Sequence, residues 1–311
     1  MTTAPEVSVV MSVYNGAEHL RASVASVLAQ ERVDLELIVV DDGSTDSSGV
    51  LLDELADADS RVRVIHQGNR GLTRALITGC AAAAGPFIAR QDCGDTSLPG
   101  RLAAQLRIVR EQPSTALVSC GTRFVGPEGE PLYEVSMGSG EATAGLLTLD
   151  VGRLRGPAHH GSALFRRDLY ERVGGYREQF RFAQDLDLWI RLAERGRHVA
   201  IPDVLYVASF VPDSISGLQR DRQIACARII VECARLRRAG MSESGALARA
   251  AAIVPRPAAA TSAERAAALY FLGACLRERA DPRARQYFRD ALRAYPLHLK
   301  SAVRLLKGWR T

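Results

Sequence analysis

The 311-residue sequence predicts an α/β protein with a mostly parallel sheet flanked by helices, followed by an α-helical C-terminal extension. The first observation is a set of short apolar, β-branched runs that each end in a polar turn, at residues 7–13, 35–40 and 86–90. The second is the helical periodicity between these runs, which is typical of βαβ units with right-handed crossovers. The third is the loss of strand patterns after about residue 222, where Gly and Pro separate helical segments.

Helices are predicted where apolar residues recur at intervals of three or four. In the first 111 residues these are Leu20, Val24, Val27 and Leu28 for one helix and Val50, Leu51 and Leu55 for the next. The second helix is expected to begin near Thr45 or Asp46, either of which can cap it. Residues 62–65 predict a further strand.

The segment that follows predicts strands with longer connections. Residues 159–165 are expected to form a strand that enters the sheet, followed by a short helix that ends at Gly174 and Gly175. Asp185 is expected to open a later helix with one apolar face. The apolar residues of that face are Leu188, Trp189 and Leu192.

The length of the chain permits two domains. We expect residues 1–221 to form the α/β domain, in two halves at 1–111 and 112–221, and residues 222–311 to form a helical region. Within that region, residues 268–296 resemble one tetratricopeptide-type helix pair. A single pair cannot bury its own apolar face, so we expect it to pack on the α/β domain or on another protomer.

The net charge of +5 is unevenly distributed along the chain. Residues 1–221 carry 22 basic and 29 acidic side chains, whereas residues 222–311 carry 18 basic and 6 acidic ones. A basic helical region with apolar faces suits either an anionic membrane surface or the acidic domain, within one chain or in a homodimer. The basic residues lack interleaved aromatic residues on a recognisable module, which argues against nucleic acid as a partner.

Cysteine usage and hydropathy narrow the cellular context. The six cysteines form no C-x-x-C pair and no metal-ligand cluster, which argues against a zinc site or a disulfide framework. No run reaches the roughly 18 apolar residues of a membrane-spanning helix, and the N-terminus lacks the pattern of a secretory signal. We therefore expect a cytoplasmic protein, either free or in peripheral contact with the inner face of the membrane.

Polar residues follow three predicted strands at the point where each strand ends. Tyr14 and Asn15 follow the first, Asp41 and Asp42 end the second, and Asp92 follows the third. The carboxyl edge of a parallel sheet is where open α/β folds bind ligands. Two adjacent carboxylates repel unless something neutralises them, which favours ligand binding by the aspartate pair over an Asx-turn at a helix start.

Five segments resemble, in order and spacing, the inverting family 2 glycosyltransferases with a glycosyltransferase A-type fold, a Rossmann-like α/β fold. The segments are VSVVMSVYNG from residue 7, LELIVVDDGSTD from residue 35, the Asn69-Arg70-Gly71 turn, IARQDCGDTSLPGRL from residue 88 and AQDLDLWIRL from residue 183. The resemblance implies transfer of a sugar from a nucleoside-diphosphate sugar, with a UDP-sugar as the expected donor. It implies a saccharide or lipid-linked acceptor, in cell-surface polysaccharide or glycolipid biosynthesis.

For the donor, the resemblance implies a nucleotide-sugar site at the sheet edge. Its residues are Tyr14, Asn15, Asp41, Asp42, Ser44, Arg74 and Asp92. The Tyr14 ring would stack on the nucleobase, and Asp41 or Asp42 would accept hydrogen bonds from the base or the ribose. The alternatives are a tyrosine at the rim of the core and, for Arg74, an exposed arginine instead of a phosphate contact.

The resemblance implies Mn²⁺ or Mg²⁺ as the cofactor, held by Asp92 and Asp95 next to the diphosphate. The family commonly has Asp-x-Asp-Asp here, whereas this chain has Asp92-Cys93-Gly94-Asp95, so the middle carboxylate is missing. Either Asp95 supplies the ligand from one position later, since Gly94 gives the turn conformational freedom, or metal binding is weakened.

The resemblance places the general base at Asp185, where a helix N-terminus favours the ionised carboxylate. A purely structural carboxylate is the alternative, and Asp187 is the weaker candidate. On the acceptor side we expect Trp189 and His160, with phosphate as the alternative partner of His160. His159 is expected to be a satisfied histidine at the rim of the site.

Two other functions fit parts of the sequence. A sugar nucleotidyltransferase would carry a Gly-rich, Arg-containing loop directly after the first strand, where this chain has Tyr14-Asn15-Gly16. A non-catalytic sugar-nucleotide-binding or scaffold protein is the remaining alternative, motivated by Gly94 and by the helical extension. Transfer of a labelled sugar would separate the enzyme from a protein that only binds.

Overall fold

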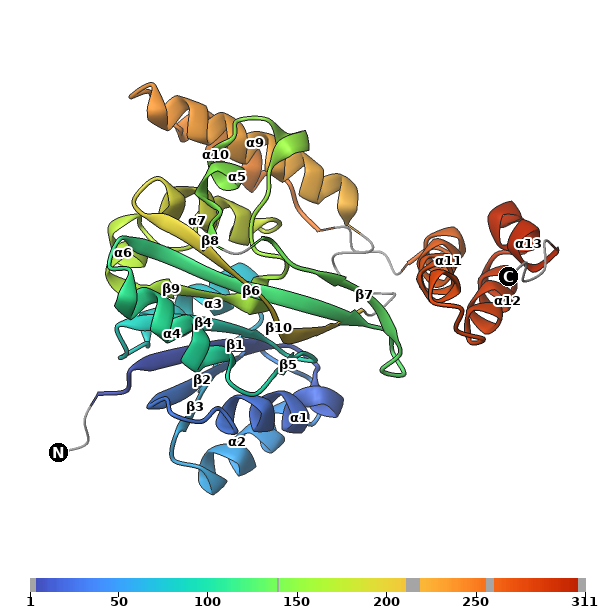
Figure 1. Ribbon diagram of the computed structural model, residues 1–311, viewed down its shortest axis with the longest axis horizontal. Coiled ribbons are helices and arrows are strands. Elements are labelled where there is room, and N and C mark those ends of the chain that lie inside the picture. Colours follow the sequence, from blue (N-terminus) through green and yellow to red (C-terminus); the bar gives the residue numbers. More distant parts are fainter. Residues whose placement is uncertain (1–3, 139, 211–218, 256–259, 307–311) are drawn as a thin grey trace. The chain divides into compact units, whose positions relative to one another are not determined.

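The computed structural model describes residues 4–138, 140–210, 219–255 and 260–306. Strands and helices alternate over the first 111 residues, as predicted (Figure 1). These elements are β1 (Val7–Val13), α1 (Ala17–Leu28), β2 (Leu35–Asp41), α2 (Ser48–Ala58), β3 (Val62–His66), α3 (Leu72–Ala81), β4 (Phe87–Asp92), β5 (Thr96–Ser97) and α4 (Arg101–Glu111).

The parallel part of the sheet brings the predicted polar strand ends together. β1 pairs in parallel with β2 on one side and with β4 on the other, and β2 pairs in parallel with β3. The register sets Val13 opposite Asp41 and Ser12 opposite Asp92. The ends of β1, β2 and β4 therefore meet at one edge of the sheet.

The second part of the chain adds antiparallel strands, so the sheet is mixed. Its elements are β6 (Thr115–Val125), β7 (Pro131–Val135), β8 (Gly140–Glu141), α5 (Thr143–Leu147), the 3-10 turns η1 (Val151–Arg153) and η2 (His160–Ser162), β9 (Ala163–Arg166), α6 (Arg167–Arg172), α7 (Gln184–Ala193) and β10 (Arg197–Ser209). The strand order is β3-β2-β1-β4-β9-β6-β10-β5, with β7 paired to β6 and β8 paired to β10. The predicted α/β fold is confirmed.

Two elements differ from the prediction. α2 begins at Ser48, whose backbone N–H donates to Asp46 Oδ1, and it buries Leu52 while Val50 is 67% exposed. Packing of α2 against β2 and β3 selects this face, which the short apolar pattern alone did not define. The predicted strand over 159–165 forms only from Ala163, because the three preceding residues make the η2 turn.

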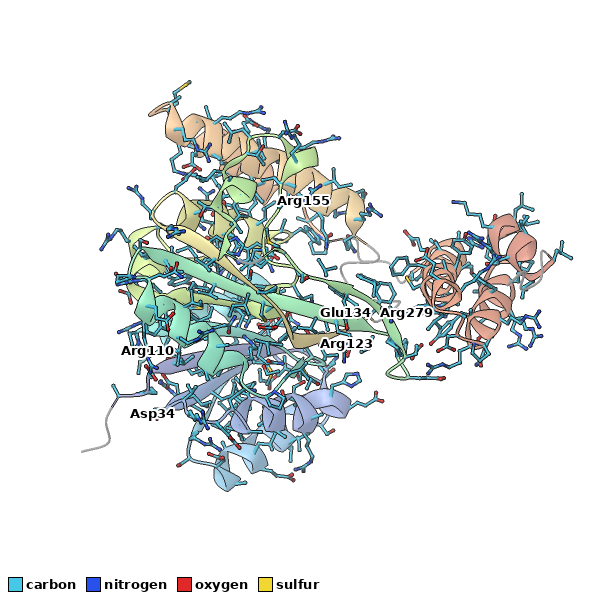
Figure 2. The ribbon with its side chains drawn as sticks, viewed as in Figure 1. Asp34, Arg110, Arg123, Glu134, Arg155 and Arg279 are labelled. Atoms are coloured by element: carbon cyan, nitrogen blue, oxygen red, sulfur yellow. The ribbon has the colours of Figure 1, made fainter. Side chains whose placement is uncertain are left out.

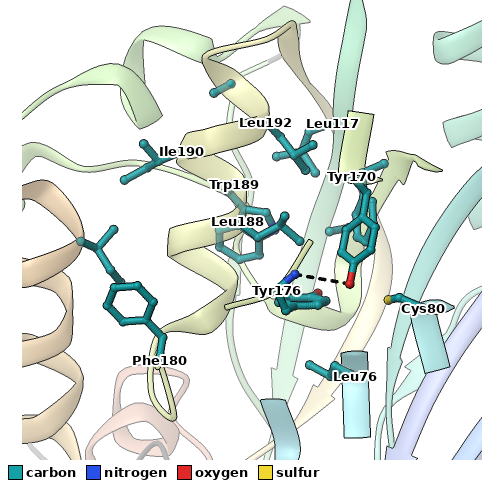
Figure 3. Close-up of a cluster of buried hydrophobic side chains, with 14 of the residues drawn as sticks. Leu76, Cys80, Leu117, Tyr170, Tyr176, Phe180, Leu188, Trp189, Ile190 and Leu192 are labelled. Carbon is teal, nitrogen blue, oxygen red and sulfur yellow. Dashed lines mark hydrogen bonds between the residues drawn. The ribbon is translucent and has the colours of Figure 1, made fainter. Parts of the chain in front are cut away.

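The core cluster beside α7 joins the strands to several helices. β1, β2, β4, β6 and β9 contribute Val10, Ile38, Ile88, Leu117 and Phe165. Helices α3 and α7 pack on these strands through Leu76, Leu188 and Leu192, as the apolar face predicted for α7 requires (Figure 3). This packing fixes the position of the helix that carries Asp185.

The helical extension forms α9 (Arg220–Arg238), α10 (Ser244–Ala251), α11 (Ser262–Glu278), α12 (Ala284–Ala294) and α13 (Leu299–Leu306). The chain forms two compact units, whose boundaries differ from the predicted one at residue 221. The first contains the residues up to Thr122 with Val135–Ala208 and Ile224–Val254, and the second contains Arg123–Glu134, Ser209–Gln223 and the residues from Pro255 onward.

The first unit includes α9 and α10 because these helices share its core and its ion pairs. Ile230 and Ala246 belong to the same buried cluster as Leu188. Arg237 pairs with Glu194 at 2.6 Å, next to the C-terminal end of α7. The first part of the basic extension is therefore built into the α/β unit.

The second unit is a helical unit built on the outer parts of β6 and β7. Leu132, Leu272 and Phe288 share one buried cluster, and a Cβ on Gly273 would lie 2.7 Å from the Phe288 ring, so α11 and α12 approach closely as a tetratricopeptide-type pair does. On the two strands, Arg123 and Glu134 form a 2.8 Å ion pair (Figure 2). Among the described residues, no helix is long and apolar enough to cross a membrane.

Candidate active site

A tight turn after β4 brings two carboxylates together. Gly94 has φ +98°, in the left-handed region that glycine tolerates without strain. The Asp95 backbone N–H donates to the Asp92 carbonyl oxygen at 3.2 Å, which closes the turn. Asp95 therefore lies beside Asp92, in the way the sequence argument from Gly94 expected.

Two residues from distant segments complete this cluster. The Tyr206 hydroxyl on β10 donates to Asp95 Oδ2 at 2.9 Å and accepts the Asp92 backbone N–H at 3.1 Å. His159 Nδ1 lies 3.4 Å from Asp95 Oδ2 and 3.7 Å from Asp92 Oδ2. One ligand atom each from Asp92, Asp95 and His159 lie within 4.8 Å of one another.

The donor set of this cluster suits a divalent cation. Carboxylates are the usual protein ligands of Mg²⁺ and Mn²⁺, and an imidazole adds a ligand that suits first-row transition metals.

Glycine is required at position 161, since a Cβ there would lie 1.9 Å from the Tyr206 hydroxyl oxygen. The η2 turn can therefore approach the acidic turn only because Gly161 has no side chain.

A buried arginine lies directly behind the acidic turn. Arg90 is fully buried, and its Nη2 lies 2.6 Å from Asp92 Oδ1. Desolvation alone would raise the pKa of Asp92, but the positive charge of Arg90, together with that of Arg101, outweighs it and lowers the pKa. Asp92 is therefore ionised at neutral pH before any cation binds.

Asp185 lies in the first turn of α7, after Ala183, whose φ of +54° bends the chain sharply into the helix. Its Oδ1 accepts the Leu186 backbone N–H at 2.9 Å. Desolvation raises the pKa of Asp185, the Leu186 N–H and His159 act in the opposite direction, and Asp92 adds to the rise. The first turn of the helix therefore does not outweigh the desolvation, and the net result is a more basic carboxylate.

Asp187, the weaker candidate for the base, lies in a buried ion-pair network. It is 1% exposed and accepts hydrogen bonds from Arg191 Nη2 at 2.6 Å and from Arg177 Nε at 3.0 Å. Arg177 pairs in turn with Glu243 of α10 at 2.6 Å. This ion-pair network fastens α7 to α10 within the first unit.

The two residues expected on the acceptor side are buried. His160 is 8% exposed and its Nε2 lies 2.7 Å from the Tyr176 hydroxyl, while burial and then Arg90 lower the pKa of His160 to about 3. Trp189 is 5% exposed and packs in the core cluster with Leu188 (Figure 3). His159 lies at the partly exposed rim, where its Nδ1 accepts the Gly161 backbone N–H and faces the carboxylates, whereas His160 is a neutral core residue and not an exposed contact for acceptor or phosphate.

Hydrogen bonds connect the residue Asn15, just after β1, to the turn that follows β2. Asn15 has φ +53°, its backbone N–H donates to Ser44 Oγ at 3.0 Å, and its Oδ1 accepts the Thr45 N–H at 2.7 Å. Asn15 and Ser44 thus shape the loops of this edge. The Tyr14 side chain is 52% exposed, which leaves its ring open to solvent.

Different protein groups stabilise the carboxylates of the adjacent residues Asp41 and Asp42. Asp42 accepts hydrogen bonds from Gln67 Nε2 at 2.7 Å and from the backbone N–H groups of Arg70 and Gly71 at 2.9 and 2.7 Å. Asp41 accepts the Ser44 N–H at 3.0 Å, and its second oxygen lies 3.0 Å from His66 Nδ1. Desolvation alone would raise the pKa of Asp41, but the hydrogen bonds of Ser44 and His66 lower it.

Arg74 does not point to a free anion position in this structure. Its Nη2 lies 2.8 Å from Glu178 Oε2, and both side chains are largely exposed. The alternative reading of Arg74 as an exposed arginine therefore fits the geometry better.

The sequence did not indicate two residues that contact the acidic turn, Tyr206 and Arg90, since a tyrosine and an arginine within strands carry no local signal of their partners.

The α/β fold carries an acidic turn after β4, Asp185 in the first turn of α7 and an aspartate pair at the end of β2, the features that the resemblance to glycosyltransferases led us to expect. The chain belongs to glycosyl transferase family 2, since residues 8–174 match the sequence profile of that family. The predicted family is therefore confirmed.

One relative agrees with this assignment, and two solved structures share the fold. EpsJ of Bacillus subtilis, an uncharacterized glycosyltransferase, is 30% identical over 223 residues, which cover 69% of this chain and 64% of EpsJ. The mannosyltransferase PcManGT from Pyrobaculum calidifontis, solved with GDP-Man and Mn²⁺, has a TM-score of 0.56 at 20% identity and covers 98% of this chain and 88% of PcManGT. TarS 1-349 of S. aureus, solved with UDP, has a TM-score of 0.56 at 17% identity, over 93% of this chain and 89% of that one.

Proposed function

We propose that this glycosyltransferase moves a sugar from a nucleoside-diphosphate sugar to a saccharide or lipid-linked acceptor, with inversion at the anomeric carbon. The observation that carries the proposal is the convergence of Asp92, Asp95 and His159 with Asp185. Asp92 raises and His159 lowers the pKa of Asp185, so Asp185 lies within electrostatic range of this cluster. A cation-binding cluster next to a basic carboxylate provides both a counter-charge for the leaving group and an acceptor for the incoming proton.

The donor is proposed to bind along the ends of β1, β2 and β4. Tyr14 is exposed at this edge and offers a ring on which a nucleobase can stack. Asp41 and Asp42 already accept several protein hydrogen bonds, which fix their oxygens in place for further contacts with a base or ribose. The known ligands of the two structural neighbours, GDP-Man and UDP, support a nucleotide donor and leave the base to experiment.

Asp92, Asp95 and His159 are proposed to hold Mn²⁺ or Mg²⁺. The Mn²⁺ of PcManGT supports a divalent cation, and the imidazole of His159 favours Mn²⁺. When bound, the cation supplies positive charge that stabilises the departing diphosphate. Tyr206 orients Asp95 by donating a hydrogen bond, and Arg90 keeps Asp92 ionised through its ion pair.

Asp185 is proposed to accept the proton of the acceptor hydroxyl. The acceptor oxygen then forms a bond to the anomeric carbon while the bond to the diphosphate oxygen breaks. Because this is one displacement from the opposite face, the configuration inverts. The raised pKa of Asp185 makes the carboxylate a stronger proton acceptor, provided that it is deprotonated at the working pH.

The helical unit is proposed to contact an anionic membrane surface or a second copy of the chain, and the cytoplasmic location stays a prediction. On α13, Leu299, Val303 and Leu306 are exposed at helical spacing next to the basic Lys300 and Arg304. Flotation with anionic liposomes tests the membrane alternative. Binding that fades with salt and is lost on deleting residues 258–311 supports it, whereas no binding at low salt, with loss of a dimer on deletion, supports the second copy.

A donor panel tests the proposed function directly. UDP- and GDP-sugars labelled in the sugar are incubated with Mn²⁺ and a mixture of saccharide and polyprenyl-phosphate-linked acceptors, and transfer is measured. The anomeric configuration of the product is read by NMR. Donor binding without transfer to any acceptor or to water would favour the non-catalytic alternative, and a product with retained configuration would contradict direct displacement.

A further inference from the structure

His66, the last residue of β3, links two carboxylates from different elements. Its Nδ1 lies 3.0 Å from Asp41 Oδ2 at the end of β2, and its Nε2 lies 3.0 Å from Asp53 Oδ1 on α2. The Asp41 side chain is 7% exposed, whereas that of Asp53 is 67% exposed. The imidazole therefore connects a buried carboxylate of the proposed donor site to an exposed one outside it.

This arrangement requires a particular protonation state. An ionised carboxylate only accepts hydrogen bonds, so both ring nitrogens of His66 must donate. A neutral imidazole carries one N–H, and its other nitrogen would set a lone pair against a carboxylate oxygen. The ring is therefore an imidazolium, in agreement with the hydrogen bonds of Asp53 and Asp41, which raise the pKa of His66.

The two contacts of His66, with Asp41 and with Asp53, form a bridge, and the surroundings make the position of Asp41 depend on this bridge. A Cβ on Gly49 would lie 3.3 Å from Asp41 Oδ2 and 3.8 Å from His66 Cε1, so the first turn of α2 closes over both groups. The charged groups that act on the ring are Asp53 of α2 and Asp41 of β2. Asp42 is held by an amide and two backbone N–H groups that do not titrate, so among the residues that the structure describes, Asp41 is the member of the pair whose hydrogen-bond partner titrates.

We propose that His66 is a positioning residue of the donor site: as an imidazolium it holds Asp41 in place, and loss of its second proton releases Asp41 and weakens nucleotide binding. The proposal rests on the proposed function, in which Asp41 contacts the donor. Because the folded protein favours the charged ring, the bridge is intact below the pKa of His66 and is lost as the pH rises through it. Donor affinity therefore falls on the alkaline side.

The test combines calorimetric titration of UDP and GDP in the presence of Mn²⁺ with NMR titration of the His66 ring between pH 5.5 and 9. Two variants isolate the bridge. His66→Gln can donate to one carboxylate but does not titrate. In Asp53→Asn the side-chain amide can accept or donate a hydrogen bond. A neutral His66 can then donate from Nδ1 to Asp41 while its Nε2 accepts a hydrogen bond from the new amide. His298→Gln removes a histidine that bonds Ser301 in the helical unit and serves as the control.

We expect the affinity of the natural protein for the bound nucleotide to fall about tenfold through the His66 titration, the size of one lost charge-assisted hydrogen bond. Asp53→Asn should lower the NMR-measured pKa of His66 and flatten this alkaline fall, as should His66→Gln, while His298→Gln should keep it. An unchanged fall in both bridge variants, or an unshifted His66 in Asp53→Asn, would overturn the positioning role alone. Absence of UDP and GDP binding at every pH would overturn the proposed donor site and the positioning role with it.

Discussion

The imidazole of His159 faces the carboxylate of Asp95, with Nδ1 3.4 Å from Oδ2. The two residues come from the η2 turn and from the turn after β4, which the mixed sheet brings side by side because β9 pairs with β4. His159 thus places an imidazole nitrogen beside the turn Asp92-Cys93-Gly94-Asp95, whose middle positions carry no carboxylate.

The proposed metal ligands make a joint prediction. Asp95→Ala and His159→Ala should each weaken Mn²⁺-dependent nucleotide binding, because each removes one of three converging ligand atoms. Nucleotide is titrated against each variant with Mn²⁺ and with EDTA. Asp57→Ala, a change to an exposed carboxylate on α2, is the control. Normal Mn²⁺-dependent binding by His159→Ala would leave only the two carboxylates as ligands.

Asp185→Asn should reduce sugar transfer by about 10²–10⁴-fold, the usual contribution of a general base, while nucleotide affinity changes little. The asparagine keeps the size of the side chain but cannot accept the proton. Transfer and nucleotide binding are measured separately on the same preparation. Turnover close to that of the unaltered protein would assign the base to another residue.

The acid limb of the pH profile is expected to report the same carboxylate. Because desolvation raises the pKa of Asp185 above 3.8, kcat/KM should fall with decreasing pH through that raised value. The fall reflects protonation of the base and should be absent from the residual activity of Asp185→Asn. A profile that stays flat down to pH 4 would contradict the raised pKa.

Gly161→Ala should disturb the acidic turn through Tyr206. The new Cβ would lie 1.9 Å from the Tyr206 hydroxyl oxygen, so the ring must leave Asp95, which loses its hydrogen bond. We expect weaker Mn²⁺-dependent nucleotide binding and lower transfer. Gly152→Ala, whose Cβ would meet only Asp150 Oδ1 at 3.4 Å, is the matched control. Equal activity of the two variants would show that the Tyr206 contact is dispensable.

Asp187→Asn should destabilise the first unit by about 3–5 kcal/mol, because it leaves the buried Arg191 without its carboxylate and removes one of the two carboxylates that pair with the partly buried Arg177. Denaturant unfolding measures the change. Glu54→Gln, which breaks the exposed pair with Arg21, should cost about 0–1 kcal/mol. A similar small cost for both changes would contradict the network role.

The same carboxylate predicts a pH dependence of stability. Desolvation acts against ionisation, but Arg191 and Arg177 lower the pKa of Asp187 below 3.8 in the folded protein. Its stabilising contribution is therefore present above pH 3.8 and is lost as the pH falls through the lowered value. The acid-induced decrease in the free energy of unfolding should be smaller in Asp187→Asn than in the unaltered protein.

The sequence by itself determined the elements that depend on local patterns. The apolar runs of β1, β2 and β4 predict strands because period and β-branching are local properties, and the polar residues that follow them predict a shared edge because parallel strands end together. The sequence also indicated the tight turn after β4, because the positive φ at Gly94 is a conformation that glycine adopts without strain whatever its surroundings. The ordered segments also indicated the family.

Only the tertiary structure decided which side chains meet. It placed His159 beside Asp95 and buried His160 against Tyr176, because the chain turns sharply between the two residues at the start of η2. It made Asp185 more basic through desolvation, which no local pattern encodes. Burial and partner choice depend on residues far apart in the chain, so they appear only when the sheet and its helices have packed.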